Sequence, residues 1–110
     1  MTDSVAHRYV AAINAQAADD LMALFADDAV LLHPVGQFEG KDAIGGFYRD
    51  IVFLGQARTE IVNHYALDGV EIAVLEATSP LDPNARSVHA ADVFALNTAG
   101  TITQLEIFYR

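Results

Sequence analysis

The 110-residue chain contains no cysteine. Without a thiol it can form no disulfide, no thiolate metal site and no cysteine nucleophile, so these kinds of chemistry are excluded together. It also has few prolines, and no Pro/Gly-rich segment, repeat or low-complexity tract divides it into parts. This length and composition predict one domain spanning residues 1–110.

Positive charge is scarce as well. Six Lys and Arg stand against 15 Asp and Glu, which gives a formal net charge of −9. A surface of this sign repels phosphate backbones, so we expect no nucleic-acid partner. No apolar run approaches the roughly 18 residues that a membrane span needs, and MTDSVAHRYV lacks the features of a signal peptide. We therefore expect no membrane partner and a cytoplasmic location.

The first half of the chain is predicted to be mainly helical. Apolar residues at helical spacing predict a helix from about Val5 to Ala15, with Ser4 as its N-cap; they are Val5, Tyr9, Ala12 and Ile13. A second helix is predicted from about Ala17, with an apolar stripe of Leu21, Leu24 and Phe25. We expect Asp27 and Asp28 to end this second helix.

A short strand, a loop and a third helix are predicted to follow. The strand runs from Ala29 to His33, and GQFEG at residues 36–40 forms the loop. The third helix runs from Lys41 to about Phe53, with one apolar side made of Ile44, Phe47, Tyr48 and Ile51.

The second half is predicted to form an antiparallel meander. Alternating apolar and polar residues predict strands at 58–67, 70–77, 86–96 and 101–109. Asp68 and Gly69 form the strongest short hairpin signal in the chain. Helices followed by such a meander indicate an α+β fold, with a curved sheet packed on the helices. A pocket opens where the helices leave the concave side unfilled.

Asp92 is the most unusual polar residue, because it lies in the apolar segment SVHAADVFALN. No lysine or arginine follows the strand alternation near enough to meet it; its own face carries Val88, Ala90, Phe94 and Leu96. A buried carboxyl without a cation keeps its proton, and a neutral carboxyl at pH 7 can donate a hydrogen bond. The alternative is an aspartate turned to solvent or bound by a backbone N–H.

Tyr9, Tyr48 and His33 are further candidates, each with a structural alternative. The tyrosines lie on predicted apolar helix faces, where core packing is the usual explanation. His33 ends an apolar strand, where it would face either a cavity, and move protons, or water. No metal-ligand spacing connects the other histidines, which are His7, His64 and His89. We therefore expect no metal and no cofactor.

The segment RYVAAINAQAADDLMALFADDAVLLHPVG resembles the opening of the bacterial ketosteroid isomerases, within the wider nuclear-transport-factor-2-like and SnoaL-like group. The likeness continues through FEGKDAIGGFY and returns at HAADVFALNTAGTITQL, and it is weakest from about Phe53 to Arg86. The resemblance implies a cone-shaped α+β barrel with an apolar pocket, and commonly a homodimer.

The resemblance also implies roles for single residues. Tyr9 falls on what looks like the oxyanion-hole tyrosine of the family, and Asp92 falls on its oxyanion-hole aspartic acid. The family is itself the standard example of such a carboxyl kept protonated by an apolar site. Tyr48 falls on a tyrosine that supports the first through a hydroxyl network. Phe25 stands where some members add another tyrosine to that network.

His33 is where the sequence departs from the family, whose general base is an aspartate immediately before the proline. Neutral imidazole, with an unperturbed pKa of about 6.5, can accept a proton at pH 7. It is longer than aspartate and carries no negative charge. A base displaced by about 1 Å can slow a reaction on the order of 100-fold.

Different classes of function are compatible with this pattern. The first is a proton-transfer enzyme, an isomerase, dehydratase or cyclase, acting on a small apolar carbonyl or enone. Tyr9 and protonated Asp92 would donate to the substrate oxygen and His33 would act as the base, or an ionised Asp92 would pair with His33 directly. The second, favoured by loss of the carboxylate base, is a non-catalytic module that binds a small apolar ligand or dimerises. The third is an interaction domain with a filled cone.

Overall fold

Ten helices and strands occupy the described part of the chain, residues 4–82 and 84–110 of a computed structural model. The helices are α1 (Val5–Ala15), α2 (Ala18–Met22), α3 (Gly40–Phe47) and the π-helix η1 (Tyr48–Phe53). The strands are β1 (Phe25–His33), β2 (Gly36–Glu39), β3 (Arg58–Leu67), β4 (Val70–Thr78), β5 (Val88–Leu96) and β6 (Ile102–Tyr109). Among these described helices, none is long and apolar enough to cross a membrane.

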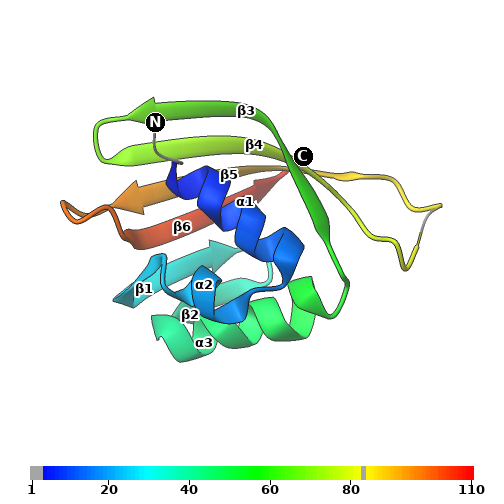
Figure 1. The fold of residues 1–110 in the computed structure, drawn as a ribbon, viewed down its shortest axis with the longest axis horizontal. Coiled ribbons are helices and arrows are strands. Elements are labelled where there is room, and N and C mark those ends of the chain that lie inside the picture. Colours follow the sequence, from blue (N-terminus) through cyan, green and yellow to red (C-terminus); the bar gives the residue numbers. More distant parts are fainter. Residues whose placement is uncertain (1–3, 83) are drawn as a thin grey trace.

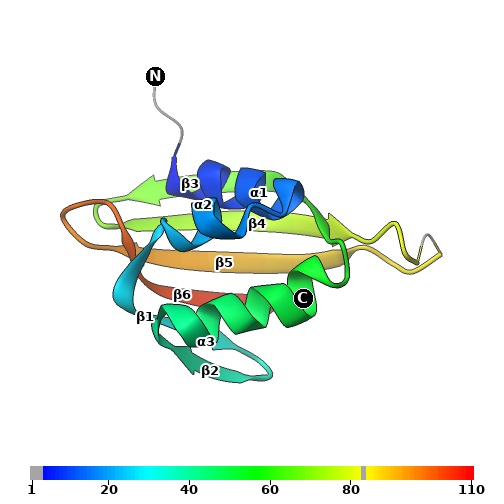
Figure 2. The same ribbon diagram turned by 60° about the horizontal axis from the view of Figure 1, so that its bottom comes forward.

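The six described strands form one curved sheet in the order β2-β1-β6-β5-β4-β3. Figures 1 and 2 show α1, α2 and α3 on one side of this sheet, which curves around them. Register shifts interrupt the pairing of β3 with β4 and of β1 with β6, and such bulges bend a strand and increase its twist. The predicted α+β class, a curved sheet on N-terminal helices, is confirmed, and the sheet stays open, with β2 and β3 at its edges.

The pairing of β1 with β6 adds one parallel pair to the predicted antiparallel sheet. These two strands run parallel, whereas the other neighbouring pairs of the described sheet are antiparallel. The alternation pattern describes each strand separately and contains nothing about which strands meet. The last strand inserts between β1 and β5, and so joins the helical half to the meander.

The second helix is shorter than predicted. It ends at Met22, and β1 begins already at Phe25, so Asp27 and Asp28 lie in a strand and do not end a helix. Phe25 pairs with Ile102 of β6, and this pairing takes the segment out of the helix. Asp27 and Asp28 fall where the pairing with β6 shifts register, and both are exposed.

Residues 36–53 also differ from the prediction. The predicted loop at 36–40 contains β2, which pairs back on β1 through a tight turn, with His33 opposite Gly36. The predicted third helix continues as far as Phe53, but it changes from α to π at Tyr48. The wider π turn rotates the apolar stripe, so that Tyr48 stays buried while Ile51 is 50% exposed.

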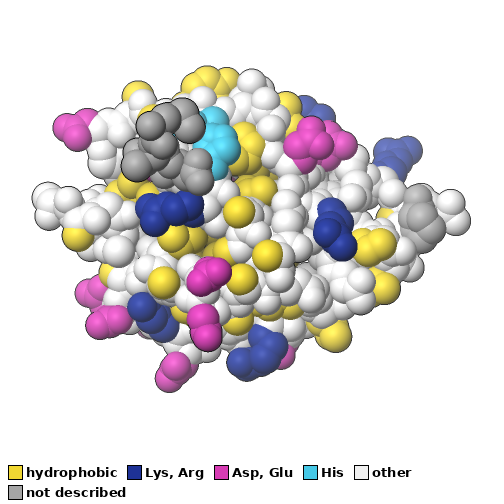
Figure 3. Space-filling view, viewed as in Figure 1, with side chains coloured by type: hydrophobic (Ala, Val, Ile, Leu, Met, Phe, Trp, Pro, Cys, Tyr) yellow, Lys and Arg dark blue, Asp and Glu magenta, His cyan; other side chains and the backbone are white. Residues whose placement is uncertain are grey.

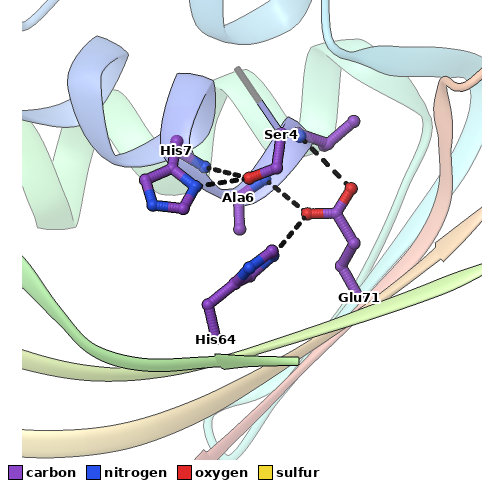
Figure 4. Close-up of polar contacts among 6 residues, drawn as sticks. Ser4, Ala6, His7, His64 and Glu71 are labelled. Atoms are coloured by element: carbon purple, nitrogen blue, oxygen red, sulfur yellow. Dashed lines mark hydrogen bonds and ion pairs between the residues drawn. The ribbon is translucent and has the colours of Figure 1, made fainter. Parts of the chain in front are cut away.

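Glu71 on β4 anchors the beginning of α1 (Figure 4). Its carboxylate accepts hydrogen bonds from the backbone N–H groups of Val5 at 3.2 Å and Ala6 at 3.1 Å, and from Nε2 of His64 at 3.0 Å. The first N–H groups of a helix have no partner within the helix, so a carboxylate there satisfies them. Burial raises the pKa of Glu71, but these hydrogen bonds outweigh burial and hold the pKa below its usual value.

A second contact at the same helix end involves the predicted cap. The Ser4 side chain accepts a hydrogen bond from the backbone N–H of His7, which confirms Ser4 as the N-cap. The exposed His7 ring packs edge-on against His64, with 5.0 Å between the ring centroids. The His7–His64 contact holds the start of α1 against β3, and the Glu71 hydrogen bonds hold it against β4; Tyr9 lies one turn further along the same helix.

Candidate functional site

A cavity of about 310 Å³ opens between the helices and the concave side of the sheet. Its walls come from α1, α3, η1, four strands (β3 to β6) and the connection between β4 and β5. Most of the lining is aliphatic or aromatic, with Ile13, Leu75 and Ile107 as examples. The volume is within the usual range for small-molecule sites. This open space beside Tyr9 and Asp92 contradicts the filled-cone alternative.

Tyr9 and Tyr48 form a buried hydroxyl pair in the cavity wall. Their hydroxyl oxygens are 2.6 Å apart, and either group can be the donor. Burial raises the pKa of both phenols well above the usual value, so both keep their protons. When Tyr48 donates to Tyr9, the hydrogen of Tyr9 is free for Asp92 or for a ligand. The Tyr9 ring packs edge-on against Phe94, which fixes its direction.

Asp92 is the single carboxylate among the described residues that line the cavity. It is 2% exposed, and its Oδ1 atom is buried without a hydrogen-bond partner in the described part of the chain. Burial raises the pKa of Asp92 to about 7, although the neighbouring Tyr9 hydroxyl offsets part of that rise. No lysine or arginine of the described residues pairs with it. A buried oxygen without a partner is costly, and a ligand atom could satisfy it.

His33 lies at the end of β1, outside the described lining of the cavity. Its Nδ1 accepts a hydrogen bond from the backbone N–H of Val35 at 3.1 Å. The neutral ring therefore carries its hydrogen on Nε2, which is 2.7 Å from the hydroxyl oxygen of Tyr109. Burial lowers the pKa of His33, which favours this neutral form. The direct His33–Asp92 pair of the dyad variant is absent from the described contacts.

Tyr109, which was not among the predicted site residues, connects His33 to the cavity. It lines the cavity from β6, and burial raises the pKa of its phenol, with a smaller contribution from Asp92. Because its oxygen accepts the hydrogen of His33, its own hydrogen is left to donate elsewhere. The period-2 pattern of β6 could have revealed it, since Tyr109 shares a face with the buried Ile107.

The structure thus brings three of the predicted site residues, Tyr9, Tyr48 and Asp92, to one cavity. Phe25 is buried behind them, with its ring centroid 6.3 Å from that of Tyr48 and outside the described lining. Since one phenol of the Tyr9–Tyr48 pair donates to the other, the second phenol and a carboxyl that is about half protonated at neutral pH can donate hydrogen bonds to an oxygen atom. The arrangement suits an apolar molecule with one carbonyl or hydroxyl oxygen.

Comparison with known families gives one match across most of the chain. The family model of the SnoaL-like domain matches residues 6–105. The match includes Tyr9, Tyr48 and Asp92 of the cavity.

Solved structures share this fold at low sequence identity. RV0760c from Mycobacterium tuberculosis superposes with a TM-score of 0.84 at 17% identity, over 100% of this chain and 95% of that one; it has also been solved in complex with estradiol-17beta-hemisuccinate. A proposed ketosteroid isomerase from Kribbella flavida gives 0.83 at 15% identity, over 96% and 75% of the two chains. A computationally designed 17-OHP binder gives 0.83 at 20% identity, over 99% and 93%. Such identities show a common fold.

Proposed function

The chain belongs to the SnoaL-like domain family, and we propose that its cavity binds a small apolar molecule through one oxygen atom held by Asp92 and Tyr9. The observation that carries the proposal is the buried Oδ1 of Asp92, which has no partner among the described residues and lies in the wall of an apolar cavity. A carbonyl or phenol oxygen seated there would satisfy the carboxyl and the Tyr9 hydroxyl together. Two proteins of the same fold support this ligand class, since one was solved with a steroid ester and one was designed as a 17-OHP binder.

The test is the binding of 2-naphthol, measured by its fluorescence between pH 5 and pH 9. We expect binding to weaken as the pH rises through about 7, because ionised Asp92 no longer donates to the naphthol oxygen. Tyr9→Phe and Asp92→Leu, which remove the two donors, should each weaken binding about tenfold, the value of a hydrogen bond of roughly 1.4 kcal/mol. The matched control is Asp28→Leu, at an exposed position on β1. Absence of binding, or equal binding by all four proteins, would overturn the proposal.

A second candidate function is proton transfer beside the bound oxygen, as in a ketosteroid isomerase-like enzyme. The observation that favours it is Asp92, whose raised pKa supplies a neutral hydrogen-bond donor near pH 7. Tyr9 and Asp92 would stabilise an enolate oxygen, each by roughly 3 kcal/mol if preorganised as oxyanion-hole donors are. Because the His33 ring lies outside the described lining, it would act as the base through Tyr109, and only in the tautomer whose Nε2 carries no hydrogen, which requires the bond from the Val35 N–H to Nδ1 to break.

This candidate is tested by the conversion of cyclohex-3-enone to its conjugated isomer, followed by ultraviolet absorbance. A catalytic cavity predicts a rate above the buffer background that Tyr9→Phe lowers on the order of 100-fold. His33→Asp tests whether a carboxylate base at this position raises the rate. If the original protein and this variant both show only the background rate, the cavity serves binding alone.

A further inference from the structure

We infer that the ligand of this cavity carries an anionic group at the end opposite its oxygen, and that Arg86 at the cavity mouth binds this group. The inference rests on the proposed function, because it takes the Asp92 end as the site of the ligand oxygen. It adds to that function a class of ligand, namely an elongated apolar acid, and it names Arg86 as the residue that selects this class.

The charges that line the cavity are separated along it. Among the described lining residues, Arg86 is the one cation and Asp92 is the one acid. Arg86 belongs to the exposed connection between β4 and β5, whereas Asp92 is buried in the middle of β5. In the described part of the chain, no carboxylate lies within 4.0 Å of the Arg86 guanidinium. Its hydrogen-bond donors are therefore available to a ligand.

The length of the ligand can be estimated from the distance along the chain between Arg86 and Asp92. Arg86 and Asp92 are six residues apart, which corresponds to about 20 Å of extended chain. Val88 and Ala90 lie between them on the same strand face and also line the cavity. Figures 1 and 2 show the connection between β4 and β5 extending beyond the end of the sheet. An arginine side chain that points into the cavity would shorten the span to be filled, so an apolar body of about 10 Å would reach both ends.

The net charge of −9 repels anions over long range, so an anionic ligand end needs a local cation to hold it. The chain has only six Lys and Arg, and on the face seen in Figure 3 the basic side chains stand apart among acidic ones. A single arginine can bind a carboxylate or a sulfate with two parallel hydrogen bonds. At the other end, a carboxylate would meet the acid Asp92 in an apolar wall and lose its water. The anionic end of the ligand is therefore directed to the mouth.

The test uses a pair of probes that differ in charge at one end. They are 4′-hydroxybiphenyl-4-carboxylate and its methyl ester, whose phenol ends are identical. Binding is measured by fluorescence at pH 6 and low salt. We expect the acid to bind about tenfold more tightly than the ester, and Arg86→Gln to remove this preference while leaving ester binding within twofold. Arg8→Gln, which changes an exposed cation of α1 outside the described lining, should behave like the original protein.

The outcomes separate the two proposals. If the ester binds but the acid has no advantage, or if Arg86→Gln leaves that advantage intact, the role of Arg86 is overturned and the proposed function stands. If the acid binds more tightly and Arg86→Gln weakens the acid alone, the inference is supported. If neither probe binds, the proposed function fails and the inference fails with it.

Discussion

At the scale of single residues, the burial of Asp92 makes the stability of the protein depend on pH. The pKa of this carboxyl is about 7 in the fold and has an ordinary value of 3.8. Between these two values the folded protein holds a proton that the unfolded chain has released. Stability contributed by the neutral carboxyl is therefore present at low pH and lost as the pH rises through this window.

We predict that Asp92→Asn removes this pH dependence. Relative to the original protein, the variant should gain about 4 kcal/mol of unfolding free energy between pH 4 and pH 8, because the amide does not ionise. The measurement is urea denaturation at several pH values, with Asp28→Asn at an exposed position as the control. Parallel pH profiles for the original protein and Asp92→Asn would show that Asp92 ionises freely in the fold.

Whether the setting of such a residue can be predicted from the sequence depends on whether its contacts are with near or distant positions in the chain. The strand alternation in SVHAADVFALN places Asp92 on the apolar face, and the structure buries it there. The setting of His33 depends on a hydroxyl 76 positions away and on a backbone N–H two residues on. Local spacing contains neither contact, so the bonding of both ring nitrogens could not be predicted.

At the scale of elements, the position of α1 determines where the Tyr9 hydroxyl points. Tyr9 lies on α1, one turn from the backbone N–H groups that donate hydrogen bonds to Glu71. The helix bounds were predictable from apolar spacing and the Ser4 cap, because both are local. Its attachment to β4 was not predictable, since Glu71 reaches the helix from a distant strand. The strand β2 was missed for the same reason, because GQFEG forms a strand only by pairing with β1.

We predict that Glu71→Gln loosens this attachment. The low pKa of Glu71 means that its charged form stabilises the fold above the usual value of 4.5 and that this stability is lost as the pH falls through the lowered pKa. The variant should lose about 2 kcal/mol of unfolding free energy at pH 7, and a smaller amount at pH 3.5. Urea denaturation at both pH values measures this, with exposed Glu60→Gln on β3 as the control. An equal loss at both pH values would contradict a role for the charge.

At the scale of the whole molecule, the two faces of the sheet differ in what covers them. The concave face carries the helices (Figure 2), and the cavity lies between them and the sheet. On the opposite face, two rows of mainly apolar side chains cross the paired strands: Tyr65, Ile72 and Val93, a row that ends at Glu106 on β6, and then Val74, Ala91 and Phe108. Tyr65 and Phe108 are 53% and 49% exposed. An apolar patch of this kind in the middle of a sheet is typical of a surface that another protein covers.

We predict that this face joins two copies of the chain, in keeping with the homodimer that the family resemblance implies. A symmetric dimer lets each apolar row meet a copy of itself, and a stable one buries roughly 800 Å² per partner. Light scattering after size exclusion should then give about twice the chain mass of 11.9 kDa. Val93→Lys, in the middle of the face, should shift the mass to that of one chain, because two lysines would be forced together in an apolar contact.

Val35→Lys, at the exposed turn between β1 and β2, should leave the dimer intact. A single-chain mass for the original protein at micromolar concentration would exclude the dimer, and a dimer that survives Val93→Lys would place the interface elsewhere.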